Sequence, residues 1–147
     1  MVHFKISTEN RPRPEDIAAI ENAVHRYNMT LMHDWAFHRV AVFLRDDADR
    51  VMGGALGGIW GGWLHLNFLW VTDGLRGQGY GSQLLARAEE QARGRGCRGV
   101  FLETHSFQAR PFYEHRGYVV VGQIEDYPQG HSYYMMCKRL VEGRSAE

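Results

Sequence analysis

Residues 64–91 read LHLNFLWV, TDGL, RGQGYG and SQLLARAEEQ in succession, and the rest of the chain is arranged around them. Apolar residues occupy alternate positions of 64–71, which predicts a β-strand. Leucines and alanines recur at helical spacing in 82–91, with arginines and glutamates between them, which predicts an amphipathic helix. The turn at 76–81 holds three glycines, and glycine accepts positive φ and lets another group approach the backbone. The stretch therefore predicts a strand that enters a helix through a glycine-rich turn.

This turn has the chemistry of a phosphate site. The first N–H groups of a helix have no partner within the helix and lie at the positive end of its dipole, and Arg76 adds a cation beside them. A plain connecting turn is one alternative, but glycines at 74, 77, 79 and 81 exceed what it needs. A dinucleotide-binding fold is another. Its G-x-G-x-x-G spacing is absent, and the roughly 65 residues that follow are too few for a doubly wound sheet.

Two successive motifs, at 76–81 and 103–118, together resemble those of the GNAT superfamily of N-acetyltransferases. R-x-x-G-x-G at 76–81, after a strand ending in LWV, resembles the acetyl-CoA signature of that family. ETHSFQARPFYEHRGY at 103–118 resembles its second motif, a strand and then a helix that carries an aromatic–tyrosine pair. The resemblance implies an α/β (α+β) fold with a mixed, mostly antiparallel sheet of about six to seven strands and about four helices. Its fourth and fifth strands would be parallel, and would splay apart at their C-terminal ends.

The periodicity of the remaining chain fits this fold. Gly61 and Gly62 are a strong hairpin signal, so the second to fourth strands are expected to form an antiparallel meander. Ser106 is expected to cap the helix that contains Pro111. We expect strands at 2–7, 38–45, 51–60, 64–71, 97–104, 118–124 and 132–140, and helices at 14–28, from the glycine turn to about 93, and at 109–116, with a short covering helix in 29–37.

Composition narrows the function. Seventeen basic and seventeen acidic residues cancel, which argues against a general nucleic-acid or membrane-surface binder and against a toxin that acts on charged tRNA. Cys97 and Cys137 have neither metal-ligand spacing nor a disulfide framework, and no metal is expected. The N-terminus lacks the long apolar run of a signal peptide, and no stretch approaches a transmembrane length. We therefore expect a cytoplasmic protein with one domain over 1–147 and a loose tail at 141–147.

The resemblance implies acetyl-CoA as the co-substrate. Its pantetheine arm would lie along the free edge of the strand at 64–71, and its pyrophosphate would bind the glycine turn, with the Arg76 side chain facing the phosphates. The expected coenzyme-binding residues are Leu69, Trp70, Val71, Arg76, Gly77, Gln78, Gly79, Tyr80, Gly81, Ser82, Ser106 and Phe112.

Acetyl transfer requires a base for the amine, a polarised carbonyl and a proton donor for the leaving thiolate. Tyr113 matches the tyrosine position of the family and is expected to be the donor. Carboxylates that often serve as the base in this family lie on the fourth strand, but 64–71 has none. Glu103 and His65 therefore both remain candidates for the base, and His105 and His131 are weaker ones.

The acceptor is expected to contact two segments, 29–37 and 125–131, through His33, Trp35, Tyr127 and His131. The sequence thus predicts an N-acetyltransferase that acts on a primary amine of a small molecule or peptide by direct attack in a ternary complex. The missing carboxylate leaves a second hypothesis, a non-catalytic acetyl-CoA-binding regulatory domain. The resemblance also makes a homodimer plausible.

Overall fold

The computed structural model describes residues 1–32 and 36–141. The chain divides into two compact units, Met1–Trp35 and Ala36–Glu147, and each is taken by itself below. One domain over 1–147 therefore stays a prediction. The predicted tail lies outside the described residues beyond Val141.

The first unit contains α1 (Pro14–Leu31). Pro14 occupies the first turn, where a missing N–H costs no hydrogen bond, and Glu15 and Asp16 lie at the positive end of the helix dipole. The helix predicted at 14–28 is therefore confirmed. The covering helix expected in 29–37 is not separate over 29–31, which belong to α1.

The strand predicted at 2–7 is wrong. Its alternating apolar residues satisfy the pattern of a strand, but no described residue pairs with them through backbone hydrogen bonds. A strand exists only as one member of a hydrogen-bonded pair, so periodicity alone does not create it.

The second unit is built on a sheet, which in the described residues has six strands in the order β1-β2-β3-β4-β6-β5. β3 and β4 are parallel, and the other neighbouring pairs are antiparallel. This confirms the mixed sheet expected from the sequence, with β3 and β4 as its predicted fourth and fifth strands. The elements are β1 (His38–Arg45), β2 (Val51–Trp60), β3 (Trp63–Val71), η1 (Asp73–Leu75), α2 (Tyr80–Gly94), β4 (Gly99–His105), α3 (Arg110–Glu114), β5 (Val119–Glu125) and β6 (Ser132–Arg139).

Two glycine features shape the meander β1-β2-β3. Gly61 and Gly62 have φ of 61° and 81°, so they form the tight turn that the sequence predicts. In β2, a Cβ at Gly53 would lie 2.7 Å from the carbonyl oxygen of Trp70, and one at Gly54 would lie 2.8 Å from that of Val42. Close approach of neighbouring strands, rather than of a ligand, therefore requires these two glycines.

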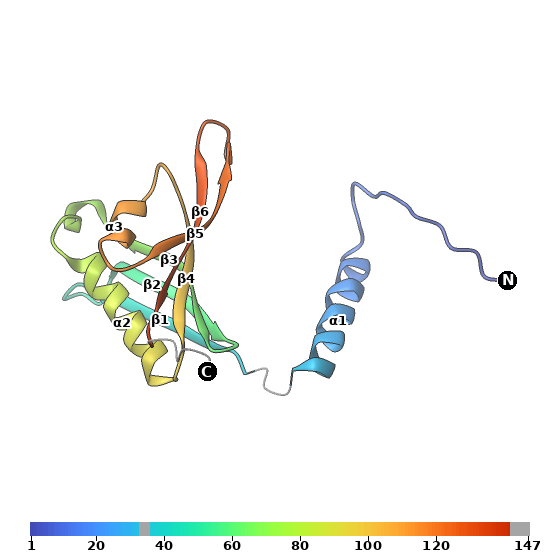
Figure 1. Ribbon diagram of the computed structural model, residues 1–147, viewed down its shortest axis with the longest axis horizontal. Helices are drawn as coiled ribbons and strands as arrows, with labels where there is room; N and C mark the ends of the chain where they lie inside the picture. The colour runs from blue at the N-terminus through green and yellow to red at the C-terminus, as the bar shows by residue number, and fades with distance from the viewer. Residues whose placement is uncertain (33–35, 142–147) are drawn as a thin grey trace, which may run out of the picture. The chain divides into compact units, whose positions relative to one another are not determined.

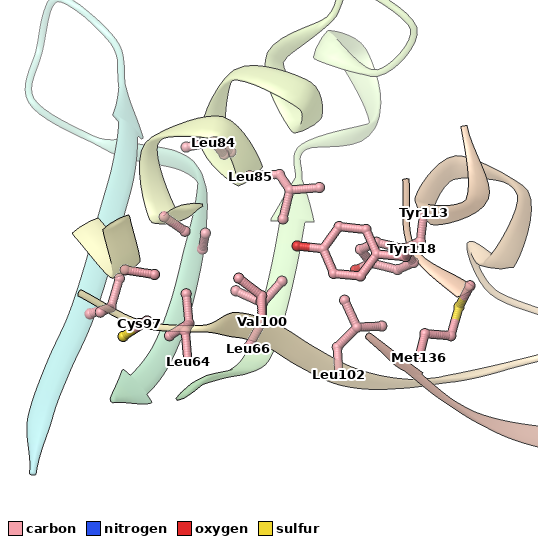
Figure 2. Close-up of a cluster of buried hydrophobic side chains, with 14 of the residues drawn as sticks. Leu64, Leu66, Leu84, Leu85, Cys97, Val100, Leu102, Tyr113, Tyr118 and Met136 are labelled. Carbon is pink, nitrogen blue, oxygen red and sulfur yellow. The ribbon is translucent and has the colours of Figure 1, made fainter. Parts of the chain in front are cut away.

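α2 lies along one face of the sheet (Figure 1). Its buried face contains the predicted apolar stripe of Leu84, Leu85, Ala88 and Ala92. Figure 2 shows Leu84 and Leu85 of this stripe above the core side chains of β3, β4 and β6, namely Leu64, Leu66, Val100, Leu102 and Met136. Each fully buried leucine stabilises the fold by about 1.5–3 kcal/mol relative to an exposed one. This packing fixes the N-terminus of α2 relative to the end of β3.

β3 and β4 separate part-way along their length. Their pairing runs only from Trp63 opposite Gly99 to Leu66 opposite Leu102. Beyond this point β3 continues along β2, and β4 continues along β6 as far as His105. In the described part of the chain, no strand pairs with the β4-facing edge of 67–71. The gap opens at the end of the sheet where β3 leads into the glycine turn.

Among the described helices, none combines the length and the apolar character needed to cross a membrane.

Candidate active site

The glycine turn leads directly into α2. Gly77 and Gly79 have φ of 74° and 86°, in the left-handed region that favours glycine. Gly79 is the N-cap of α2 and supplies no side-chain cap. A Cβ at Gly77 or Gly79 would meet no atom within 4 Å, so conformation rather than crowding requires glycine there. The first N–H groups of α2 are therefore not capped by a side chain of the N-cap residue.

A pocket of about 390 Å³ opens beside this turn. It brings together most of the predicted coenzyme-binding residues from β3, the turn and α3. Leu69, Trp70, Gln78 and Ser106 do not line it, whereas Leu75 and Arg116 do and were missed. The lining residues are Val71, Leu75, Arg76, Gly77, Gly79, Tyr80, Gly81, Ser82, Phe112 and Arg116. Arg116 follows Phe112 by one helical turn in the second motif, and this spacing could have revealed it.

Arg76 braces the turn against the end of β3. Its Nε donates to the carbonyl oxygen of Val71 at 2.9 Å, and its Nη2 lies 3.1 Å from Oδ1 of Asp73. The guanidinium lines the pocket while it holds these two partners. Arg76 thus fixes the loop's shape, and its predicted contact with phosphate stays a prediction.

Tyr113 lies on α3 and is buried, with only 7% of its surface exposed. Its ring contacts Phe112 and Tyr118, at centroid distances of 5.2 and 5.6 Å. Figure 2 shows Tyr113 and Tyr118 together above Leu102 and Met136. Burial raises the pKa of Tyr113 to about 12, because the low-polarity surroundings disfavour the phenolate. Tyr113 therefore stays protonated at neutral pH.

His65 and Glu103 meet where β3 and β4 separate. Nε2 of His65 lies 2.7 Å from Oε2 of Glu103, and the imidazole stacks on Phe101 with the ring centroids 4.3 Å apart. Nδ1 of His65 lies 3.4 Å from Nδ2 of Asn67. The sequence offered His65 and Glu103 as alternative bases, and the structure brings them together as one pair.

His65, but not Glu103, lines a cavity of about 410 Å³ on the sheet. Aromatic rings make up most of its wall. The lining residues are Phe37, Gly58, Trp60, Trp63, His65, Asn67 and Phe101. The imidazole of His65 is therefore accessible from a cavity with a largely aromatic wall.

A second aromatic cluster lies at the end of β4 and along the loop between β5 and β6. His105 stacks on Phe107 at 5.2 Å, and Tyr127 lies 5.9 Å from His105 and 5.6 Å from Tyr133. His131 contacts Phe107 at 4.8 Å. The predicted acceptor residues Tyr127 and His131 thus lie in one cluster with His105, Phe107 and Tyr133. His33 and Trp35, the other two predicted acceptor residues, lie outside the described residues.

The prediction that Ser106 caps the helix at 109–116 is wrong. α3 begins after Ala109 without a side-chain cap. Ser106 instead bonds to Ser132: its N–H donates to the Ser132 carbonyl at 2.8 Å, and its Oγ accepts the Ser132 N–H at 3.0 Å. A serine caps a helix only when it immediately precedes the first turn, and this one is used to join β4 to β6.

Known proteins are similar to this chain in sequence and in fold. The Acetyltransferase (GNAT) family matches residues 7–118. Blasticidin-S acetyltransferase of Streptomyces morookaense is 42% identical over 101 residues, which cover 68% of this chain and 74% of that protein. An acetyltransferase of Agrobacterium fabrum is 34% identical over 122 residues, 83% of this chain and 89% of that protein. The crystal structure of an acetyltransferase from Bacillus cereus superposes with a TM-score of 0.85 at 36% identity, covering 91% of this chain and 98% of the other.

The family match extends over α1 and both motifs, so it does not depend on the glycine turn alone. The structural match covers the sheet with its parallel β3–β4 pair, which confirms the fold class expected from the sequence. A putative streptothricin acetyltransferase from Bacillus anthracis, which shares the fold at 19% identity with a TM-score of 0.62, was solved in complex with acetyl coenzyme A. The chain is therefore an acetyltransferase of the GNAT family.

Proposed function

We propose that this acetyltransferase transfers the acetyl group of acetyl-CoA to a primary amine of a small molecule by direct attack within a ternary complex. The observation that carries the proposal is the 2.7 Å contact between His65 and Glu103, because it supplies a base where β3 and β4 separate.

The donor occupies the gap and the glycine turn. The pantetheine amides pair with the β4-facing edge of 67–71, as an added strand would. The pyrophosphate accepts hydrogen bonds from the N–H groups at the start of α2. A backbone N–H near Leu69 or Val71 polarises the acetyl carbonyl. The thioester then lies between the base on one side and α3 on the other.

His65 accepts the proton of the attacking amine. With its own proton on Nε2, bonded to Glu103, the ring has its lone pair on Nδ1, where the attacking amine replaces the Asn67 amide that lies 3.4 Å away. Glu103 stabilises the imidazolium that forms. Removing a proton from a lysine-like amine at pH 7 costs about 4–5 kcal/mol, whereas an α-amine costs about 1 kcal/mol. The pair therefore matters most for strongly basic acceptors.

Tyr113 stabilises the leaving sulfur. The new C–N bond forms as the C–S bond breaks, and the electron pair of the C–S bond stays on the thiolate, which accepts a hydrogen bond from the phenol. A pKa of about 12 exceeds that of a thiol, near 8.5, so complete proton transfer is uphill by roughly 5 kcal/mol. We therefore assign Tyr113 mainly as a hydrogen-bond donor, and solvent delivers the final proton to sulfur.

The acceptor binds along the aromatic cluster of His105, Phe107, Tyr127, His131 and Tyr133. Rings of this kind bind planar groups by stacking and cations through their faces. Burial raises the pKa of Tyr133, and the negative charge of Glu103 raises it further. Glu103 therefore lies close to this cluster. One relative is named for blasticidin S, a small molecule. We therefore propose an antibiotic-like amine that carries a planar group.

A thiol-release assay with acetyl-CoA tests this function. The panel contains blasticidin S, streptothricin, polyamines, amino acids and peptides with free N-termini. We expect thiol release with a planar small-molecule amine and little with peptides. If the protein binds acetyl-CoA and no amine releases thiol, the regulatory-domain hypothesis replaces this one.

A further inference from the structure

A second groove adjoins the glycine-turn pocket. It has a volume of about 540 Å³ and lies between α2, the end of α3 and β6. Ser82 and Arg116 line both cavities, so the two lie side by side. The other lining residues are Leu85, Ala86, Glu89, His115 and Lys138.

The groove presents more positive than negative charge. Its acidic residue, Glu89, is only 5% exposed. The Glu89 carboxylate accepts hydrogen bonds from Nζ of Lys138 at 2.9 and 3.1 Å and from the hydroxyl of Tyr118 at 3.2 Å, and Arg93 lies 3.5 Å away. The negative charge is thus neutralised inside the protein, while His115 and Arg116 line the opening.

Arg116 is held in place without an acidic partner. Its Nε donates to Oγ of Ser82 at 2.7 Å, its Nη1 donates to the carbonyl oxygen of Phe112 at 2.9 Å, and its Nη2 also reaches Ser82. The guanidinium lies over the Phe112 ring, 3.7 Å from the centroid. Among residues 1–32 and 36–141, no carboxylate lies within ion-pair distance of it.

A guanidinium fixed in this way is prepared for an anion. Arginine has five N–H donors, and three of them are used by Ser82 and Phe112. The remaining two N–H groups form the planar fork that binds phosphate oxygens. Because the group is half-buried and unpaired with a carboxylate, a bound phosphate would supply the missing negative charge.

We propose that this groove binds the 3′-phosphate of the adenosine half of coenzyme A, with Arg116 as the main contact and His115 and Lys138 beside it. The proposal rests on the proposed function, because the coenzyme must already be placed at the glycine turn. In coenzyme A, the pyrophosphate joins pantetheine on one side to 3′-phosphoadenosine on the other. With pantetheine in the β3–β4 gap, the adenosine leaves the turn on the opposite side, where the groove continues.

Matched donors test the site. We compare the KM of acetyl-CoA with that of acetyl-3′-dephospho-CoA, which lacks only this phosphate, and the Kd of the two free coenzymes by calorimetry. The wild-type protein should prefer the phosphorylated form by about tenfold, the scale of one charge-assisted contact. Arg116→Gln should remove this preference by weakening only the phosphorylated form, and exposed His115→Gln should reduce it in part.

Arg87→Gln is the control, because Arg87 lies on α2 outside both cavities and pairs with Glu90 at 3.4 Å. It should leave the preference unchanged. Equal weakening of both donors by Arg116→Gln would overturn the proposal, since it would place Arg116 at the pyrophosphate or in the fold. Equal binding of both coenzymes by the wild type would overturn it too, and would leave acetyl transfer intact. The calorimetric comparison gives this answer even if no acceptor is found.

Discussion

The imidazole of His65 on β3 and the carboxylate of Glu103 on β4 are joined by a 2.7 Å contact across two parallel strands. The contact lies at the point where the two strands stop pairing. A carboxylate absent from β3 is thus present on its neighbour β4, where it contacts the histidine of β3.

His65→Gln should lower kcat/KM for a lysine-like acceptor about 100-fold at pH 7, because a positioned base contributes at least this much. The deficit should shrink as the pH approaches the pKa of the amine, near 10.4, where the acceptor loses its proton unaided. Thiol release measured from pH 7 to 10 gives the profile. His105→Gln is the comparison: it alters the aromatic cluster proposed to bind the acceptor, so any loss of kcat/KM should be the same at every pH. A deficit that stays constant across this range would show that His65 does not act as the base.

Tyr113→Phe should leave the KM of acetyl-CoA unchanged and lower kcat about 100-fold, because the leaving sulfur loses its hydrogen-bond donor. Tyr118→Phe provides the comparison. Its hydroxyl bonds to Glu89 rather than facing the coenzyme, so its kcat should remain near that of the wild type. Equal kcat values for the two variants would contradict the role of Tyr113.

Buried Tyr113 should also make the free energy of unfolding depend on pH in the alkaline range. Its pKa is raised from 10.0 to about 12 in the folded protein. Below pH 10 the Tyr113 phenol is protonated in both the folded and the unfolded protein, so its contribution to stability is fully present. Between pH 10 and 12 the phenol ionises in the unfolded protein and stays protonated in the folded one. Folding stability therefore falls over this interval, by about 2–3 kcal/mol from Tyr113. Urea unfolding at pH 9 and 11.5 should show a smaller loss for Tyr113→Phe than for the wild type.

Gly79→Ala should destabilise the protein by about 1–2 kcal/mol, because alanine disfavours the φ of 86° found there. It should also weaken acetyl-CoA binding by displacing the first N–H groups of α2. Gly74→Ala is the matched control: an added Cβ meets no atom within 4 Å there either, and its φ is not in the left-handed region. Similar effects of both changes, measured by thermal unfolding and calorimetry, would argue against this explanation.

Tyr127→Ala should raise the KM of the acceptor about three- to tenfold and leave the KM of acetyl-CoA unchanged, because each ring contact contributes about 0.5–1.5 kcal/mol. Tyr127→Phe keeps the ring and should retain the wild-type acceptor KM. If the acceptor KM stays the same in both variants, the acceptor does not bind along this cluster.

The strand, the glycine turn and the helix could be predicted because each is encoded by neighbouring residues. Arg76 and the glycines stand next to one another in the sequence, so their common pocket followed from local spacing. The His65–Glu103 contact could not be predicted, because it depends on the register of two strands joined through α2. The predictions of a helix cap at Ser106 and of a strand at 2–7 were wrong for a related reason. A cap and a strand both need a hydrogen-bonding partner, and the local sequence pattern does not identify that partner.

The separation of β3 from β4 leaves an incomplete hydrogen-bond ladder in the middle of the sheet rather than at its margin. An unpaired strand edge attracts other peptide chains and promotes aggregation. Bound acetyl-CoA would pair with this strand edge and shield it. Occupancy by the coenzyme would therefore delay the onset of turbidity on heating. Substrate supply and colloidal stability would then be linked through one interrupted pair of strands.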